Sequence, residues 1–302
     1  MRHLLIILSG MILAACSAER RDEGGDRLQV SVSDGAQAWI ASQIAGEDAE
    51  VTALIRPGAD AETYEPDMAT LAALQTSDLY LHTDTEGFER RISAKVAQEL
   101  PDVRQVNVAE GVELLYGTHG LSHDSRGHGA AGHNGESPDP HLLGSVRNAR
   151  VVAANICRAL SEADTIHRND YGRRLAQLSL RLDSLDQAFD CVAEMAAEGG
   201  AKVRYLVMHP TLSYLARDYG FEQIAIEAEG KEPTPREYAR RMEETKRLRP
   251  AVYFVEKGSD ESRDSEVADM VGARLVEVSL GSADWFGSLS RIAATLGEAQ
   301  RK

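Results

Sequence analysis

The chain has 302 residues, of which 43% are hydrophobic, so it is long enough to bury the cores of two domains of ordinary size. Its formal net charge of −15 argues against binding to the phosphate backbone of nucleic acids and suits a cation as the ligand. No nucleic-acid partner is therefore predicted.

The N-terminus has the pattern of an export signal. Residues 1–15 hold one Arg, then an apolar run that is too short for a membrane span, and then small residues. The stretch "LAAC" at 13–16 resembles a bacterial lipobox, in which Cys16 becomes the lipid-bearing N-terminus; an ordinary signal peptide with a chance cysteine is the alternative. We therefore predict a signal peptide over 1–15, a lipidated tether over 16–26 and an extracytoplasmic lipoprotein anchored to a membrane.

The next part of the chain alternates between short apolar runs and amphipathic stretches. This alternation is typical of strands and helices that build a parallel sheet covered by helices. Residues 27–163 are thus predicted to form an N-terminal lobe. Its strands are predicted at 28–33, 50–55, 79–82 and 103–109, and its helices at 34–46, 68–77, 88–100 and 142–160.

A glycine-rich stretch within this lobe contains five of the nine histidines of the chain. Neutral imidazole is the commonest metal ligand in proteins, and a connection of this length is either functional or disordered. We therefore predict an auxiliary metal loop over 117–138; a polar tract that contains histidine by chance is the alternative. The five residues are His119, His123, His128, His133 and His141, the first four assigned to the loop.

A long helix is predicted over 164–198, where apolar residues keep helical spacing and no proline interrupts. Strands and helices then alternate again through 199–302, which gives a C-terminal lobe. The predicted fold is therefore α/β, with two (β/α)4-type lobes joined by one bridging helix. The strands of the second lobe are predicted at 203–209, 222–228, 251–257 and 274–279, and its helices at 211–220, 234–249, 264–272 and 284–302.

Several side chains are placed where a ligand of such a fold would bind. His209 ends a predicted strand, and ligands of open α/β sheets bind beyond the carboxyl ends of strands. Asp139 precedes His141 by two residues in a proline-stiffened turn, so it can orient the imidazole or cap the next helix. Glu62 and Glu65 follow the second strand, although carboxylates are also common on any surface. Alternatively, His209 is a structural residue whose ring is hydrogen-bonded by nearby backbone groups.

Cys157 and Cys191 lie in helical patterns with no CxxC or zinc-finger spacing. Either a disulfide or two buried free thiols are consistent with the sequence. His82 and His167 are interpreted as structural residues.

Four segments together resemble one family. They are "GADAETYEPDMATLAALQTSDLYL", "DPHLLGSVRNARVVAANI", "VMHPTLSYLARDYGFEQIAIEAEGKEPTP" and "AVYFVEK". Their order and content are similar to the zinc/manganese solute-binding proteins of bacterial ABC transporters, the ZnuA/TroA-like family. The resemblance covers essentially the whole mature chain and includes the histidine-rich loop of the zinc members. It implies two lobes bridged by a rigid helix, with one metal ion in the cleft.

The resemblance also implies a set of ligands. His141 and His209 match two family ligands directly, whereas Glu62 stands where the family has a histidine. Ser279 stands at the position of a family aspartate, which makes Glu256 a candidate for the fourth ligand. Asp139, Ser279 and Glu229 are expected around these ligands.

The implied function is capture of Zn²⁺, with Mn²⁺ as the alternative, and delivery to the membrane permease of an ABC transporter by a monomeric protein that is not an enzyme. Two other classes fit parts of the pattern. Two histidines and one glutamate with an open position are typical of a zinc hydrolase, but no HExxH motif or evident nucleophile accompanies them. A surface adhesin or receptor with the same fold is the other alternative, because two ligand positions are substituted.

Overall fold

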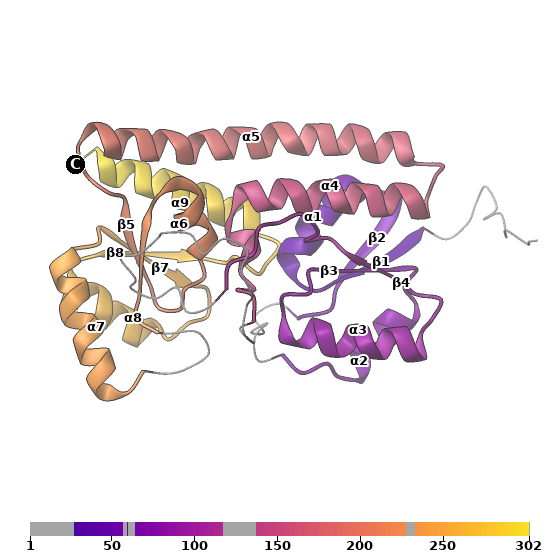
Figure 1. Ribbon diagram of the computed structural model, residues 1–302, viewed down its shortest axis with the longest axis horizontal. Helices are drawn as coiled ribbons and strands as arrows, with labels where there is room; N and C mark the ends of the chain where they lie inside the picture. Colours follow the sequence, from indigo (N-terminus) through magenta and orange to yellow (C-terminus); the bar gives the residue numbers. More distant parts are fainter. Residues whose placement is uncertain (1–26, 57–58, 60–63, 117–136, 228–232, 302) are drawn as a thin grey trace, which may run out of the picture.

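The computed structural model describes residues 27–56, 59, 64–116, 137–227 and 233–301. Two α/β lobes lie side by side, and one long helix runs across both of them (Figure 1). This helix, α5 (Arg168–Glu198), has 31 residues and is therefore roughly 45 Å long. The predicted fold class is confirmed.

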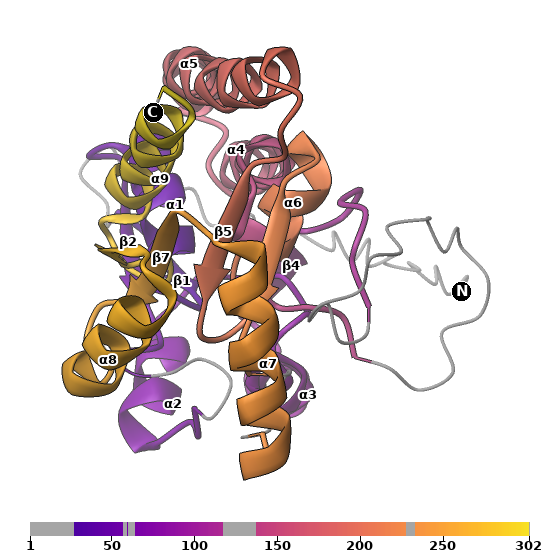
Figure 2. The same cartoon turned by 90° about the vertical axis from the view of Figure 1, so that its left-hand side faces the viewer.

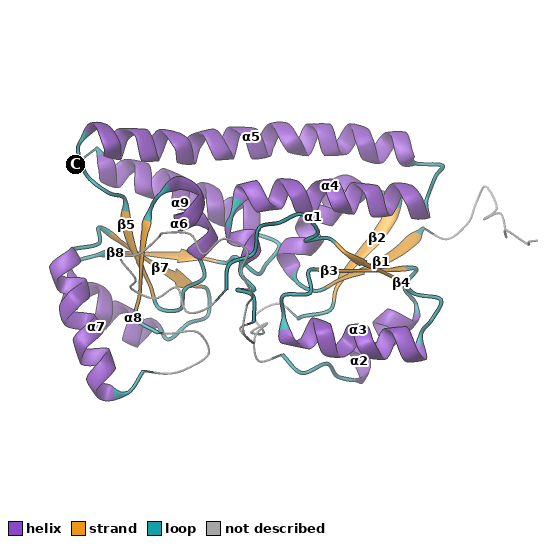
Figure 3. Cartoon of the chain, viewed as in Figure 1, coloured by secondary structure: helices purple, strands orange, loops and turns teal. Residues whose placement is uncertain are grey.

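The N-terminal lobe contains a parallel four-stranded sheet in the order β2-β1-β3-β4 (Figure 3). Its strands are β1 (Leu28–Val32), β2 (Ala49–Ala53), β3 (Leu79–His82) and β4 (Arg104–Asn107). Its helices are α1 (Gly35–Ala45), α2 (Met68–Gln75), α3 (Gly87–Glu99) and α4 (Val146–Ala163), with a 3₁₀ turn, η1 (Leu142–Gly144), before α4.

The C-terminal lobe repeats this topology, because its parallel sheet has the order β6-β5-β7-β8. Its strands are β5 (Arg204–Val207), β6 (Glu222–Ala225), β7 (Val252–Glu256) and β8 (Arg274–Val278). Its helices are α6 (Ser213–Tyr219), α7 (Pro235–Leu248), α8 (Glu261–Val271) and α9 (Trp285–Gln300).

The largest hydrophobic core is shared by the two lobes. It lies below α5 and includes buried residues from α1, α4, α6 and α9 (Figure 2). Each lobe also has a smaller core on the other face of its sheet, under α2 and α3 in one lobe and under α7 and α8 in the other. The shared core means that the lobes are packed together as well as tethered.

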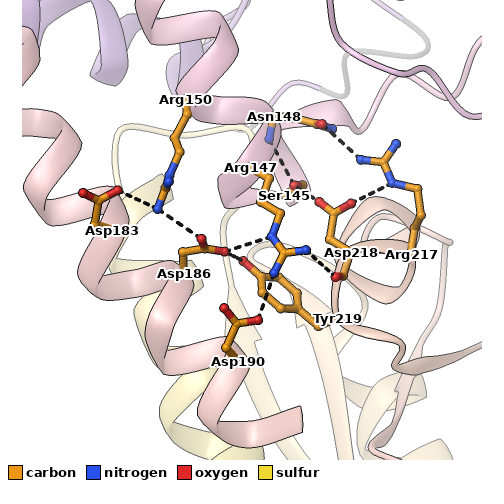
Figure 4. Close-up of polar contacts among 10 residues, drawn as sticks. All are labelled: Ser145, Arg147, Asn148, Arg150, Asp183, Asp186, Asp190, Arg217, Asp218 and Tyr219. Atoms are coloured by element: carbon orange, nitrogen blue, oxygen red, sulfur yellow. Dashed lines mark hydrogen bonds and ion pairs between the residues drawn. The ribbon is translucent and has the colours of Figure 1, made fainter. Parts of the chain in front are cut away.

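A network of charged side chains fixes α4 and α6 against α5 (Figure 4). Asp186 of α5 accepts hydrogen bonds from Arg147 and Arg150 of α4, at 3.1 Å each, and from the Tyr219 hydroxyl of α6. Asp190 accepts a further bond from Arg147 at 2.9 Å. The network therefore joins the N-terminal lobe, the bridging helix and the C-terminal lobe.

The opposite side of α5 is held by aromatic rings. Trp39 of α1 packs against Trp285 and Phe286 of α9, with ring centroids 5.4 and 5.3 Å apart. The Arg181 guanidinium of α5 lies over the rings of Trp39 and Phe286, at 5.0 and 4.5 Å. This cluster also joins both lobes to the bridging helix.

Some predicted boundaries were wrong, and local hydrogen bonds explain them. The bridging helix begins at Arg168 rather than at 164, because the Asp164 carboxylate accepts the Ile166 and His167 amides and forms a turn. Helix α8 begins at Glu261 rather than at 264, because the Asp260 carboxylate caps its first amides.

Strand β5 ends at Val207, so His209 follows the strand by two residues instead of ending it. The pairing of β5 with β7 stops at Val207, opposite Phe254, and the chain then leaves the sheet.

Both cysteines in the described part of the chain are free thiols. Cys157 is buried and Cys191 is exposed, so the buried-thiol prediction is confirmed for the first and wrong for the second. No helix in the ranges given above is long and apolar enough to cross a membrane. The predicted signal peptide and the lipidation site, Cys16, lie outside the described residues.

Candidate metal centre

A cavity of about 100 Å³ lies where the two lobes face each other. The N-terminal lobe contributes the segment from Pro140 to Gly144 and the residues after β1 and β3, and the C-terminal lobe contributes Thr211, Leu280 and Gly281. Asp34, Thr83, Thr211 and Leu280 follow the carboxyl ends of β1, β3, β5 and β8, where open parallel sheets bind their ligands, whereas Pro140–Gly144 precedes α4. The topology of the two sheets therefore directs part of both lobes toward this cavity.

His141 lines the cavity and is oriented by Asp139. The Asp139 carboxylate is buried; it accepts the His141 amide and contacts His141 Nδ1, both at 2.9 Å. When Nδ1 donates its proton to Asp139, the lone pair that can bind a metal is on Nε2. A carboxylate behind an imidazole is the usual arrangement around metal-binding histidines, because it fixes the ring and raises its basicity.

His209 comes from the other lobe and lies beside His141. Their ring centroids are 5.2 Å apart and the ring planes meet at 60°. The two imidazoles, separated by 68 positions in the sequence, can therefore approach one metal ion at the usual Zn–N distance of about 2.0–2.1 Å.

The close approach of the two histidine segments depends on Gly144. A Cβ atom at this position would lie 2.9 Å from the Thr211 carbonyl oxygen, a distance that requires the chain to shift. The absence of a side chain thus lets the turn after His141 pack against the turn after His209.

Glu256 ends β7 near the two histidines. The side chain of Glu256 is exposed, and its carboxylate accepts hydrogen bonds from the Leu280 amide at 3.0 Å and from Ser279. Ser279, which stands at the position of a family aspartate, contacts the carboxylate of Glu256.

The N-terminal wall of the cavity contains polar residues that the sequence interpretation did not select. Asp34 caps α1 by accepting the Gln37 amide at 2.7 Å, and burial raises the pKa of its carboxyl group to about 7. Thr83 and Glu86 also line the cavity, and the buried carboxylate of Glu89 accepts the Thr83 amide. Asp34 and Thr83 could have been selected from the sequence because each directly follows a predicted strand, β1 or β3.

The remaining histidines of the described residues play local roles. His82 stacks on Tyr80, with centroids 5.3 Å apart, and burial lowers its pKa. His167 lies at the start of α5, where its Nδ1 is 2.6 Å from Asp164.

No three His, Cys, Asp or Glu side chains within the described residues are close enough to form a complete metal site. The structure places His141 beside both His209 and Asp139, and Asp139 contacts the His141 ring on its Nδ1 side. The other predicted positions, Glu62, Glu229 and the four loop histidines His119, His123, His128 and His133, lie outside the described residues.

Two lobes, a long connecting helix and paired imidazoles at the cavity between them define the class of metal-binding solute-binding proteins. Within this class, the chain belongs to the ZnuA family, "zinc-uptake complex component A periplasmic", whose model matches residues 30–299. The predicted resemblance is thus confirmed.

Individual relatives differ in the metal that their names record. The chain is 25% identical over 277 residues to the zinc-binding lipoprotein AdcA of Streptococcus pneumoniae R6; the match covers 90% of this chain but 53% of AdcA, so the chain spans about half of that relative. It is also 25% identical to the manganese ABC transporter substrate-binding lipoprotein PsaA of Streptococcus mitis, covering 85% of this chain and 81% of PsaA. A crystal structure of ZnuA superimposes with a TM-score of 0.77 at 25% identity, covering 91% of this chain and 100% of the ZnuA chain.

Proposed function

We propose that the chain captures Zn²⁺ outside the cytoplasmic membrane and delivers it to the membrane permease of an ABC transporter. The observation that carries this proposal is the pairing of His141 with His209, 5.2 Å apart between ring centroids, across the two lobes. Capture and release need no chemical step, so no catalytic residue is proposed.

The proposed ligands are His141 and His209, with Glu62 as a third and Glu256 as a candidate fourth. Asp139 orients His141 and Ser279 holds the Glu256 carboxylate, as the hydrogen bonds described above support. Glu229 is proposed near the site on the basis of sequence alone.

Zinc is proposed over manganese because of the donor types. Imidazole nitrogen is a good donor for zinc, whereas manganese favours sites dominated by carboxylate and water oxygen. The relative AdcA is named as zinc-binding and PsaA as a manganese-transporter protein, so the family includes both metals. Manganese is therefore the competing cargo that the titration must include.

The proposed setting is the outer face of a bacterial cytoplasmic membrane or the periplasm, with lipid on Cys16 as the anchor and a monomeric carrier. The relatives AdcA and PsaA are both named lipoproteins, which supports this location. A single lipid-bearing terminus holds a protein at a membrane without crossing it.

The decisive experiment is a competition titration of metal-stripped residues 27–302 with Zn²⁺ and Mn²⁺ against chelators of known affinity. The double variant His141→Ala/His209→Ala is expected to lose the tight site, and His167→Ala, whose ring contacts Asp164 away from the cavity, is the matched control. Tight zinc binding that survives in the double variant would reject the proposal. Tighter binding of manganese than of zinc would reject zinc as the cargo.

The histidine-rich loop is proposed as a second, weaker zinc station. Each site in such a loop must overcome the entropy of ordering the chain around the ion. Deletion of residues 119–133 is expected to lower the total zinc bound and to leave the tight site unchanged, as measured by the same titration. Loss of the tight site in the deletion variant would contradict this division of roles.

A further inference from the structure

The segment that carries His141 belongs to the N-terminal lobe, yet its main chain is hydrogen-bonded by side chains of the C-terminal lobe. The Tyr214 hydroxyl of α6 donates to the Asp139 carbonyl oxygen at 2.8 Å. The Trp285 indole N–H of α9 donates to the Leu143 carbonyl oxygen at 2.7 Å. These two carbonyl groups lie two residues before and two residues after His141.

Both donors are fully buried, with 0% exposure of Tyr214 and Trp285. Loss of a hydrogen bond in such surroundings is strongly destabilising, because no water can replace the donor at the buried carbonyl oxygen. The donors come from two different helices, α6 and α9, so the contact is made at two separate points of the second lobe.

The Tyr214 hydroxyl has a second partner. It accepts the Leu115 amide at 3.2 Å, while the Leu115 carbonyl accepts the Asp139 amide at 2.8 Å. One hydroxyl group thus connects two neighbouring main-chain segments of the N-terminal lobe. The geometry of the Asp139 turn, whose carboxylate in turn holds the His141 ring, therefore depends on a residue of the other lobe.

We propose that Tyr214 and Trp285 are positioning residues for the metal centre: they form a clamp that fixes His141 relative to His209 before the metal arrives. This inference rests on the proposed function, since it assumes that His141 binds the metal. His209 lies five residues before Tyr214, in the same lobe as the clamp. Each donor therefore holds the His141 segment against the C-terminal lobe, which carries His209.

Pre-organisation is what the clamp would provide. A site whose ligands are already in place loses less entropy when the ion binds, and a misplaced imidazole weakens every bond of the coordination shell. Removing the groups behind a metal-binding histidine typically lowers metal affinity about 10–100-fold. Because the clamp acts one step further away, through the Asp139 turn, we expect Tyr214→Phe to lower zinc affinity about tenfold.

The test compares three variants of the full mature chain with the unmodified protein. Tyr214→Phe and Trp285→Phe each remove one donor and keep an aromatic ring. Tyr253→Phe is the matched control, because its buried hydroxyl donates to Asp264 at 2.7 Å in the outer core of the C-terminal lobe. Trp285→Phe and Tyr253→Phe each lose one buried hydrogen bond, and Tyr214→Phe loses the bonds to the Asp139 carbonyl and from the Leu115 amide. Only Tyr214→Phe and Trp285→Phe lose a contact with the His141 segment.

Two measurements follow. In the metal-free proteins, amide hydrogen exchange at Asp139, His141 and Gly144 is expected to accelerate at least about tenfold in Tyr214→Phe or Trp285→Phe relative to Tyr253→Phe. In titrations with Co²⁺, used as a coloured substitute for Zn²⁺, both clamp variants are expected to show a weaker affinity and an altered visible absorption band. The control is expected to retain the spectrum and the affinity of the unmodified protein.

The two measurements separate the clamp from the proposed function. Unchanged exchange and an unchanged cobalt spectrum in Tyr214→Phe, with a loss of thermal stability equal to that of Tyr253→Phe, would overturn the clamp and leave the transport proposal intact. If the unmodified chain bound neither cobalt nor zinc tightly, the proposed function and a clamp that serves it would both be rejected. Accelerated exchange would then show only that these side chains hold the segment.

Discussion

On one side of α5, carboxylates of the bridging helix face arginines of α4 (Figure 4). Toward α1 and α9, the Arg181 guanidinium lies over the rings of Trp39 and Phe286 instead. Both sides connect the two lobes, but their side chains differ in how much they are exposed to solvent. Several ionic side chains are partly exposed, for example Asp190 at 48%, while Trp285 on the aromatic side is at 0%. The aromatic side is therefore expected to supply most of the stability, and the ionic side is expected to depend on salt.

The strongest test of this contrast removes the buried indole. Trp285→Ala is expected to lower the free energy of unfolding by about 3–5 kcal/mol, because a large cavity replaces the ring and the Leu143 carbonyl loses its donor. Urea denaturation at about 0.05 and about 0.5 M NaCl, a tenfold change in ionic strength, should give the same loss at both. Trp39→Ala, at a half-buried position, is the control and should cost less. A loss that depended on salt would contradict the assignment.

Asp186 is expected to be the most important acid of the ionic side. Its side chain is 16% exposed and accepts bonds from Arg147, Arg150 and Tyr219, so Asp186→Ala leaves three donors without this acceptor. We expect a loss of about 1–3 kcal/mol in the free energy of unfolding, measured by urea denaturation. An effect no larger than that of the more exposed Asp190 would mean that the network acts only through long-range charge.

Asp190 makes the contrast sharper because it is exposed and contacts only the edge of the network. Asp190→Ala removes the hydrogen bond from Arg147 and is expected to cost less than about 1 kcal/mol. The same denaturation experiment at high salt should reduce this loss toward zero, since mobile ions screen exposed charges. A salt-independent loss would place Asp190 in the same class as Asp186.

The smallest effect is expected at the N-terminal end of α5, and it depends on pH. The hydrogen bond with Asp164 is the main cause of a raised pKa of His167. A raised pKa means that the folded chain holds the proton more tightly, so this contribution to stability is complete below the ordinary pKa of 6.5 and is lost as the pH rises through the raised value. His167→Asn should therefore destabilise the protein at about pH 5.5 and have little effect at about pH 9. A larger effect at the higher pH would reverse the sign and reject the explanation.

The sequence predicted the order of strands and helices well because each element carries its own local signal. The strands are short apolar runs, and caps such as Asp34 before α1 mark where helices begin. Predicted helix boundaries were wrong where a side chain accepts hydrogen bonds from nearby amides before the helix begins, as the Asp164 carboxylate does. The predicted position of His209 at the end of a strand was wrong because β5 stops pairing with β7 at Val207, and the end of that pairing depends on a second strand.

The candidate site was predicted only in part. His141 and His209 could be selected because a histidine after a strand, or in a rigid turn, stands out locally. Tyr214 could not be selected in this way, because its hydroxyl partner, the Asp139 carbonyl, is 75 positions away in the sequence and any tyrosine in an apolar helix has the same local pattern. Contacts between the lobes form only when the chain is packed, so they produce no periodic pattern in the sequence.

The contact between the first turn of α1 and the turn after β8 is made by main-chain atoms. The Gly35 amide donates to the Gly281 carbonyl at 3.1 Å, and a Cβ atom at Gly35 would lie 2.8 Å from that oxygen, whereas a Cβ at Gly281 would meet nothing within 4 Å. The spacing between the lobes at this point therefore does not depend on most side chains, but it does depend on Gly35. A single methyl group at residue 35 would push these two turns apart, and it would alter the width of the cavity proposed to hold the metal without touching any proposed ligand.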